Sequence, residues 1–154
     1  MKAKNFYIPD GIEYYMPSDA VKLEKIKSKI LKIYAKYNYT YVIPPIFDNL
    51  DNLLNLKSTD LDSETALVLD KRTSKEIGIR ADITPQISKI DYQMTKGSGN
   101  SRFSYMGDIL RLSPGPFDRI NPYQTGAEYF GKLNNKCKER IVKLLINKDK
   151  YEKN

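Results

Sequence analysis

The chain has 154 residues, 40% hydrophobic and 29% charged, a composition that can close one modest core and is not typical of a disordered protein. It has no histidine and one cysteine, Cys137, which excludes an internal disulfide, a cysteine-based zinc cage and every Ser-His or Cys-His nucleophile pair. The net charge is +7, and residues 132–154 carry most of it, with eight basic and three acidic side chains. No apolar run approaches the roughly 18–20 residues of a membrane helix, and the first residues lack the apolar stretch of a secretory signal. We therefore expect a cytoplasmic protein.

The first third of the chain predicts helix and strand in turn. Apolar residues recur at the helical period over residues 18–37, with Ser18 and Asp19 offering cap and first-turn chemistry and lysines on the opposite face as a solvated surface. Residues 39–43 are rich in β-formers and predict a strand that ends at two prolines. A short helix is expected near residues 49–56.

The following residues predict a hairpin, a helix and two longer strands. Residues 65–69 and 76–80 favour strands joined by a polar turn. The Thr84 hydroxyl is the expected cap of a helix with Pro85 in its first turn. Two long strands are expected at 101–111 and 123–130, separated by a Pro/Gly loop over 113–117. Hairpin-paired strands with helices before and between them indicate an α+β domain on an antiparallel sheet.

The region after this domain forms a separate unit in our interpretation. We divide the chain into a domain over 1–131 and a basic, helical tail over 132–154, with Ile141, Leu144 and Leu145 on one side of the helix. The tail is the only feature that favours nucleic acid, and its positive residues are mostly lysines, which lack the planar fork of arginine. We do not expect nucleic-acid binding.

Five polar residues are candidates for a binding site. Asp82 and Thr84 lie at a strand-to-helix junction, Arg111 ends a strand, and Gln124 and Glu128 lie four apart on the last strand, so that both point to one face. Two carboxylates that face an arginine can bind an amino acid through both its ammonium group and its carboxylate group. The alternative is a set of ordinary ion pairs at strand ends. No glycine-rich nucleotide-binding motif or nucleophile elbow is present, and we expect neither a cofactor nor a metal.

Several ordered blocks carry a resemblance to a known family. Residues 80–84 (RADIT), 105–111 and 124–131 (QTGAEYFG) resemble class II histidyl-tRNA synthetases. The closer resemblance is to their paralogue, the regulatory subunit of ATP phosphoribosyltransferase, because residues 78–86 read GIRADITPQ where the synthetase typically has Arg-Pro-Glu-Gly-Thr. Residues 8–13 (IPDGIE) and 42–45 (VIPP) agree with it. The resemblance covers about residues 7–131.

The resemblance implies a class II synthetase-like antiparallel sheet flanked by helices and incomplete on its C-terminal side. Residues 42–45 would lie in motif 1, which builds the dimer interface in such proteins, and residues 101–130 in motif 2. It also implies a histidine-like ligand for Asp82, Thr84, Gln124 and Glu128. The arginine matching Arg111 grips a phosphate or carboxylate of the adenylate in the synthetase.

The departures from the synthetase pattern concern catalysis. The synthetase has Arg-x-Glu where this chain has Arg111, Leu112 and Ser113, and its two loop arginines fall on Asp118 and Ile120, with Arg119 out of register. These arginines are needed because adenylate formation concentrates negative charge in the transition state. Motif 3 and the histidine-specific blocks would come later than residue 154. We therefore expect an apparently truncated relative without aminoacylation activity.

These observations lead to one main hypothesis and three alternatives. The chain is interpreted as a non-catalytic regulatory subunit that assembles with the short-form ATP phosphoribosyltransferase catalytic subunit, with histidine as effector and self-association through the motif 1 region. Such a subunit would support the first step of histidine biosynthesis and its feedback regulation. The alternatives are a degenerate histidyl-tRNA synthetase fragment, a nucleic-acid-binding module and a non-functional remnant.

Overall fold

The fold consists of two small sheets and their helices. The computed structural model describes residues 7–54, 64–112 and 119–132, and part of 134–143. Sheet A has the strand order β1-β5-β6 and sheet B the order β2-β4-β3. The strands of sheet A are β1 (Thr40–Tyr41), β5 (Ser101–Asp108) and β6 (Tyr123–Phe130). Those of sheet B are β2 (Phe47–Asp48), β3 (Ala66–Asp70) and β4 (Lys75–Ile79). The predicted α+β class is confirmed.

Sheet A is mixed, which corrects the expectation of purely antiparallel strands. β5 and β6 form an antiparallel pair, whereas β1 runs parallel to β5, with Thr40 opposite Phe103. Parallel neighbours need a long connection, and here it includes all of sheet B and the helices over residues 50–53 and 84–95. β1 is only two residues long, so hairpin signals in the sequence could not indicate its partner.

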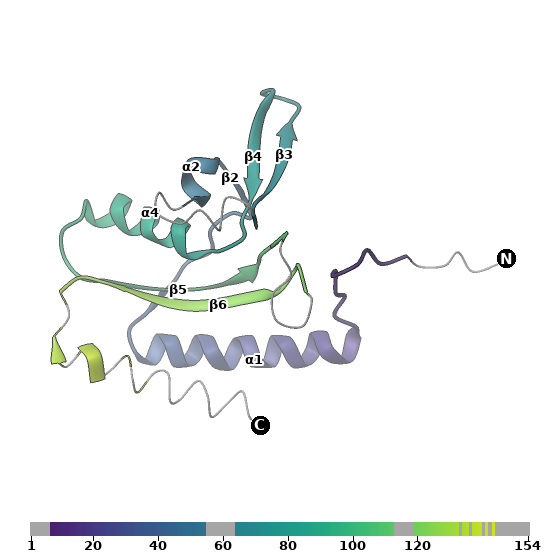
Figure 1. The fold of residues 1–154 in the computed structure, drawn as a ribbon. Coiled ribbons are helices and arrows are strands. Elements are labelled where there is room, and N and C mark those ends of the chain that lie inside the picture. The colour runs from purple at the N-terminus through teal and green to yellow at the C-terminus, as the bar shows by residue number, and fades with distance from the viewer. Residues whose placement is uncertain are drawn as a thin grey trace.

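Two helices cover opposite faces of sheet A (Figure 1). α1 (Pro17–Lys36) buries Ile30 and Tyr34 against Met106 of β5. The expected side-chain cap from Ser18 is wrong, whereas Asp19 does lie in the first turn. The N-cap is Met16 and makes no side-chain cap, while Pro17 takes the first turn, where its missing N–H leaves nothing unsatisfied.

α4 (Thr84–Thr95) covers the other face of sheet A and buries Ile83 and Ile87 completely against Phe103. The expected cap by the Thr84 hydroxyl is wrong, because the N-cap is Ile83 and has no side-chain cap. Two side chains from outside the helix accept its first N–H groups instead. Asp82 Oδ1 accepts from Thr84 N at 2.9 Å, and Gln124 Oε1 accepts from Ile83 N at 2.9 Å. The Thr84 hydroxyl is therefore available for another partner.

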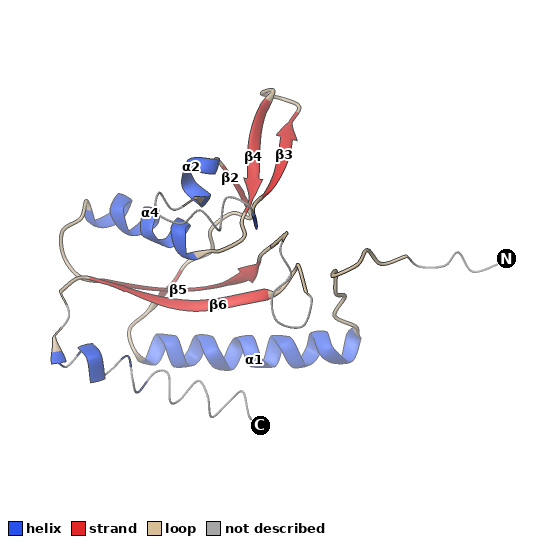
Figure 2. Cartoon of the chain, viewed as in Figure 1, coloured by secondary structure: helices blue, strands red, loops and turns tan. Residues whose placement is uncertain are grey.

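The predicted hairpin of β3 and β4 is confirmed and projects away from sheet A (Figure 2). Its turn is closed by Asp70, which accepts hydrogen bonds from Arg72 and Thr73. These bonds, first of all the one from the Arg72 side chain, lower the pKa of Asp70 to about 2. β2 pairs with the other edge of β4 and was not predicted, because two residues make no pattern. The short helix α2 (Leu50–Leu53) follows β2.

Arg80 joins the two sheets. Its side chain is 4% exposed and donates to three main-chain carbonyls, Asp108 O at 2.8 Å, Pro44 O at 2.7 Å and Pro45 O at 3.3 Å. The guanidinium fits because Gly107 has no side chain, and a Cβ there would collide with Arg80 Nη2. Burial lowers the pKa of Arg80. This arginine holds the end of β5 against the segment that leaves β1.

Several sequence expectations fall outside the described residues. They concern the loop over 113–117, residues 55 and 56 of the short helix, and Leu144 and Leu145 of the tail. The described residues 135, 137–139, 141 and 143 are helical. Within the described part of the chain, no helix is long and apolar enough to cross a membrane.

Candidate functional site

Four of the five predicted site residues come together on the face of sheet A that α4 covers. Gln124 and Glu128 share this face of β6 with Gly126 between them, as their spacing predicted. Asp82 immediately precedes α4, and Thr84 is its first residue. The strand thus supplies two side chains of the cluster and the helix start supplies the other two.

A polar clamp fixes Asp82. Gln124 Nε2 donates to Asp82 Oδ1 at 2.8 Å, the same oxygen that accepts from Thr84 N. Because the Gln124 carbonyl also holds Ile83 N, one amide ties β6 to the beginning of α4 at two points. The carboxylate of Asp82 is therefore held in one orientation, with Oδ2 pointing away from the clamp.

Tyr105 connects the remaining two residues and was given no role in the sequence analysis. It is 3% exposed, and its hydroxyl lies 3.0 Å from Thr84 Oγ1 and 3.3 Å from Glu128 Oε1. Tyr105 lies opposite Gly126 in the β5–β6 register. The alternation of Phe103 and Tyr105 along β5 could have placed this ring on the α4 face, but nothing in the sequence indicates its hydroxyl partners.

The electrostatics of the cluster follow from its burial. Burial raises the pKa of Glu128, the hydrogen bond from Tyr105 opposes this rise, and the charge of Asp82 adds to it. Burial also raises the pKa of Tyr105 to about 12, so the phenol keeps its proton at neutral pH. Asp82 and Glu128 are thus close enough to interact.

Among the described residues, no ion pair joins Arg111 to Asp82 or Glu128, in contrast to the predicted arrangement. Its Nε donates to Ala81 O at 3.0 Å and lies 4.0 Å from Glu64 Oε2. Arg119, the other arginine of this region, pairs with Glu13 at 2.8 Å. Arg111 follows the end of β5, beyond the last paired residue Asp108, and its partner Ala81 is the residue next to Asp82.

The cluster can hold a group that donates hydrogen bonds. Among the described residues, Asp82 Oδ2 and Glu128 Oε2 have no donor, although both side chains are partly buried. Two carboxylates with open acceptor atoms favour an ammonium or a similar N–H group. The described residues contain no group of three acidic or cysteine side chains that could hold a metal ion.

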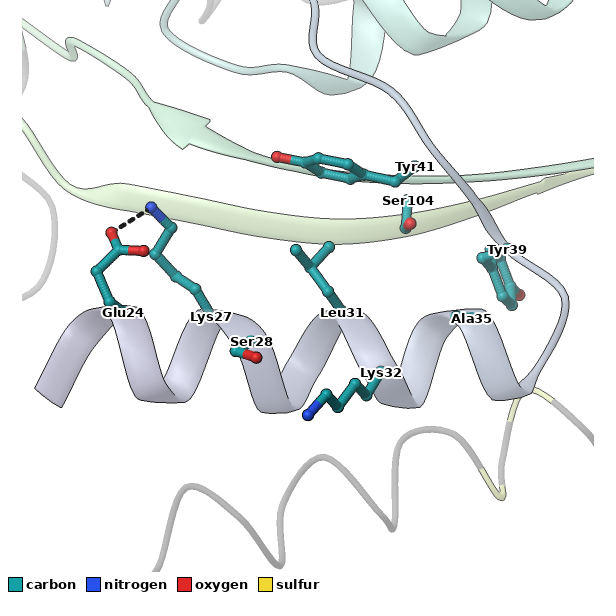
Figure 3. Close-up of a pocket in the computed structure, with 9 residues that line it drawn as sticks. All are labelled: Glu24, Lys27, Ser28, Leu31, Lys32, Ala35, Tyr39, Tyr41 and Ser104. Atoms are coloured by element: carbon teal, nitrogen blue, oxygen red, sulfur yellow. Dashed lines mark hydrogen bonds and ion pairs between the residues drawn. The ribbon is translucent and has the colours of Figure 1, made fainter.

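A separate hollow lies on the opposite face of sheet A, under α1. It has a volume of about 610 Å³ and is lined by α1, Tyr39, Tyr41 and Ser104. Figure 3 shows Lys27 and Leu31 pointing from the helix towards the strands. Sequence reasoning missed this hollow, because its charged, hydroxyl and apolar lining residues form no motif in the sequence. It does not contain any of the predicted site residues.

The layered arrangement and the motif 2 hairpin of β5 and β6 define the beginning of a class II synthetase-like domain. The solved structure of an ATP phosphoribosyltransferase regulatory subunit/histidyl-tRNA synthetase from Bacillus halodurans superposes with a TM-score of 0.79 at 18% identity, over 98% of this chain and 39% of that one. At this identity the likeness concerns the fold alone.

A family model described as histidyl-tRNA synthetase matches residues 11–150, and the chain belongs to this family. Its curated relatives include the ATP phosphoribosyltransferase regulatory subunit of Hahella chejuensis, 36% identical over 140 residues, or 90% of this chain and 35% of the relative. The regulatory subunit of Methylobacillus flagellatus is also 36% identical, over 93% of this chain and 37% of the relative. The chain thus spans about a third of the length of these relatives. The resemblance identified from the sequence is confirmed.

Proposed function

We propose that this chain acts as a non-catalytic regulatory subunit of ATP phosphoribosyltransferase, which supports the first step of L-histidine biosynthesis and lets histidine regulate it. Relatives that carry this name match nine-tenths of the chain. The observation that carries the proposal is the cluster of Asp82, Thr84, Gln124 and Glu128, whose open carboxylate oxygens suit an amino-acid ligand. We place the protein in the cytoplasm.

Histidine is the effector in this proposal, held by Asp82, Thr84, Gln124 and Glu128. Its α-ammonium group would lie against the open carboxylate oxygens, and Arg111 would reach the ligand only by leaving Ala81 and Glu64. Regulation requires that histidine bind one state of the assembly better than another, because only differential affinity shifts an equilibrium.

Two observations support the absence of catalysis in this proposal, namely the sequence that follows Arg111 and the ion pair of Arg119. Ser113 stands where the synthetase pattern has a glutamate, and Arg119 pairs with Glu13 at 2.8 Å. Both features disfavour stabilisation of the charge that develops in adenylate formation. The alternative of a degenerate synthetase fragment predicts ATP–pyrophosphate exchange driven by histidine, and we expect none.

Two partners belong to the proposal, the short-form catalytic subunit and a second copy of the chain. Self-association would use the motif 1 region, where four large apolar side chains are exposed. These are Tyr41, Ile43, Ile46 and Phe47. Ile43 is 74% exposed, an unusual position for this residue type unless another surface covers it.

Association with the short-form catalytic subunit tests the proposal. We expect the mixed proteins to elute together in size-exclusion chromatography at micromolar concentration and physiological salt, at a position that neither protein reaches alone. An unrelated protein of similar basic charge is the control, because a net charge of +7 can cause nonspecific association. Separate elution of the two proteins would contradict the proposal.

A further inference from the structure

The hydroxyl group of Tyr105 links two residues of the proposed ligand site. Its neighbours are Thr84 Oγ1 at 3.0 Å and Glu128 Oε1 at 3.3 Å, and the ring is packed in the apolar cluster of Ile83 and Ile87. A buried hydroxyl group must keep its hydrogen bonds, since leaving one unmade is costly. Tyr105 is therefore fixed between the two site residues.

The charge of Glu128 sets the direction of these hydrogen bonds. A charged carboxylate only accepts, so Tyr105 must donate its single hydroxyl proton to Glu128. Either oxygen of the Thr84–Tyr105 pair can be the donor. Because Tyr105 donates its hydroxyl proton to Glu128, Thr84 must donate its own hydroxyl proton to the Tyr105 oxygen. The Thr84 hydroxyl then has only lone pairs left for a ligand.

Gly126 provides the room for this arrangement. It lies directly opposite Tyr105 in the register and between Gln124 and Glu128 on the same face of β6. A Cβ at Gly126 would collide with the ring and hydroxyl of Tyr105. The ring thus lies over β6 at the one position where no side chain blocks its path to Glu128.

We propose that Tyr105 is a positioning residue that polarises the hydroxyl chain from Thr84 to Glu128 and thereby makes the Thr84 hydroxyl a hydrogen-bond acceptor towards the ligand. Asp82 and Glu128 contribute carboxylate oxygens, and Thr84 contributes lone pairs. Such a set of acceptors favours an ammonium-bearing amino acid over an analogue that lacks the ammonium group. The selectivity for histidine rests on the proposed function, whereas the direction of the hydroxyl chain does not.

The pKa of Glu128 reports on the hydroxyl chain without any ligand. Burial already raises this pKa, and the bond from Tyr105 lowers it by favouring the charged form. Tyr105→Phe removes this donor, so the protonated form of Glu128 becomes more stable relative to the charged form. We expect the titration midpoint of Glu128 to rise further, by roughly one pH unit. The midpoint is measured by NMR on protein with labelled glutamate carboxyl groups, and Glu128→Gln identifies the signal.

Tyr34→Phe is the matched control. Tyr34 is also 3% exposed, but its hydroxyl bonds to Thr125 at 3.3 Å on the other face of β6. We expect the Glu128 midpoint to stay at its wild-type value in this variant. Gly126→Ala, which displaces the Tyr105 ring, should shift the midpoint in the same direction as Tyr105→Phe. An unchanged midpoint in Tyr105→Phe, or an equal shift in Tyr34→Phe, would overturn the proposal.

Ligand selectivity gives the second measurement. Wild-type protein should bind histidine at least tenfold more tightly than imidazolepropionate, which lacks the ammonium group. Tyr105→Phe should reduce this ratio of affinities several-fold. If wild type does not bind histidine but the Glu128 midpoint still shifts, the proposed effector is wrong and the polarised hydroxyl chain is supported. If histidine binds and its preference is unchanged in Tyr105→Phe, Tyr105 does not set selectivity and the inference fails.

Discussion

Arg80→Ala is expected to lower the free energy of unfolding by about 3–5 kcal/mol, since it removes charge-assisted hydrogen bonds from a buried site and leaves a cavity. The carbonyls of Pro44 and Asp108 lose the Arg80 donor at once, whereas the carbonyl of Pro45 keeps its hydrogen bond from Gln86 Nε2. They belong to segments on either side of the junction between the sheets, so no single movement of the chain replaces the guanidinium. Urea denaturation followed by circular dichroism measures the change.

Two other arginine variants serve as comparisons for the stability of Arg80→Ala. Arg72→Ala removes an arginine that is 88% exposed and pairs with Asp70 in the hairpin turn, and we expect little change in the unfolding midpoint. Arg80→Lys keeps the charge but cannot donate in three directions from a planar group, so an intermediate loss is expected. If Arg80→Ala were no more destabilising than Arg72→Ala, the assignment of Arg80 as the joint between the sheets would be wrong.

Asp82→Asn is expected to weaken histidine binding about 5- to 10-fold, because a hydrogen bond to a charged group contributes roughly 1–1.5 kcal/mol more than its neutral replacement. Asn keeps one carbonyl oxygen for Thr84 N and Gln124 Nε2, so the beginning of α4 should survive the change. The effect should therefore appear in affinity and not in folding. Isothermal titration calorimetry with histidine measures it, together with thermal unfolding of the same variant.

Asp51→Asn is the control for this experiment, since it removes the same charge from an exposed position on α2. We expect its histidine affinity to equal that of the wild type. Equal losses in Asp82→Asn and Asp51→Asn would indicate a general effect of charge. An Asp82→Asn protein that binds histidine as well as the wild type would remove Asp82 from the site.

Local patterns predicted the parts of the fold that depend on neighbouring residues. The hairpin of β3 and β4 was predicted because two β-rich runs flank a polar turn, and its turn residue Asp70 makes the expected local bonds. Gln124 and Glu128 were predicted to share a face because side chains alternate along a strand, and the register confirms it. These inferences need no knowledge of distant residues.

The errors concern features that distant residues decide. Both helix caps were predicted from hydroxyl residues at the helix start, but Pro17 begins α1 and the side chain of Gln124, some forty residues away, holds the beginning of α4. Arg111 was expected to face the carboxylates, yet it lies beyond the paired end of β5. Tyr105 was missed for the same reason, because its role depends on Gly126 on another strand.

The rate of the short-form ATP phosphoribosyltransferase catalytic subunit, measured with and without this chain and across a range of histidine concentrations, tests the central claim most directly. We predict that the chain raises the rate of the catalytic subunit and that histidine lowers the rate of the mixture. We also predict that Asp82→Asn moves the inhibition to higher histidine concentrations, while Asp51→Asn does not. A rate and a histidine response that stay the same when the chain is added, at concentrations where the proteins elute together, would contradict the claim.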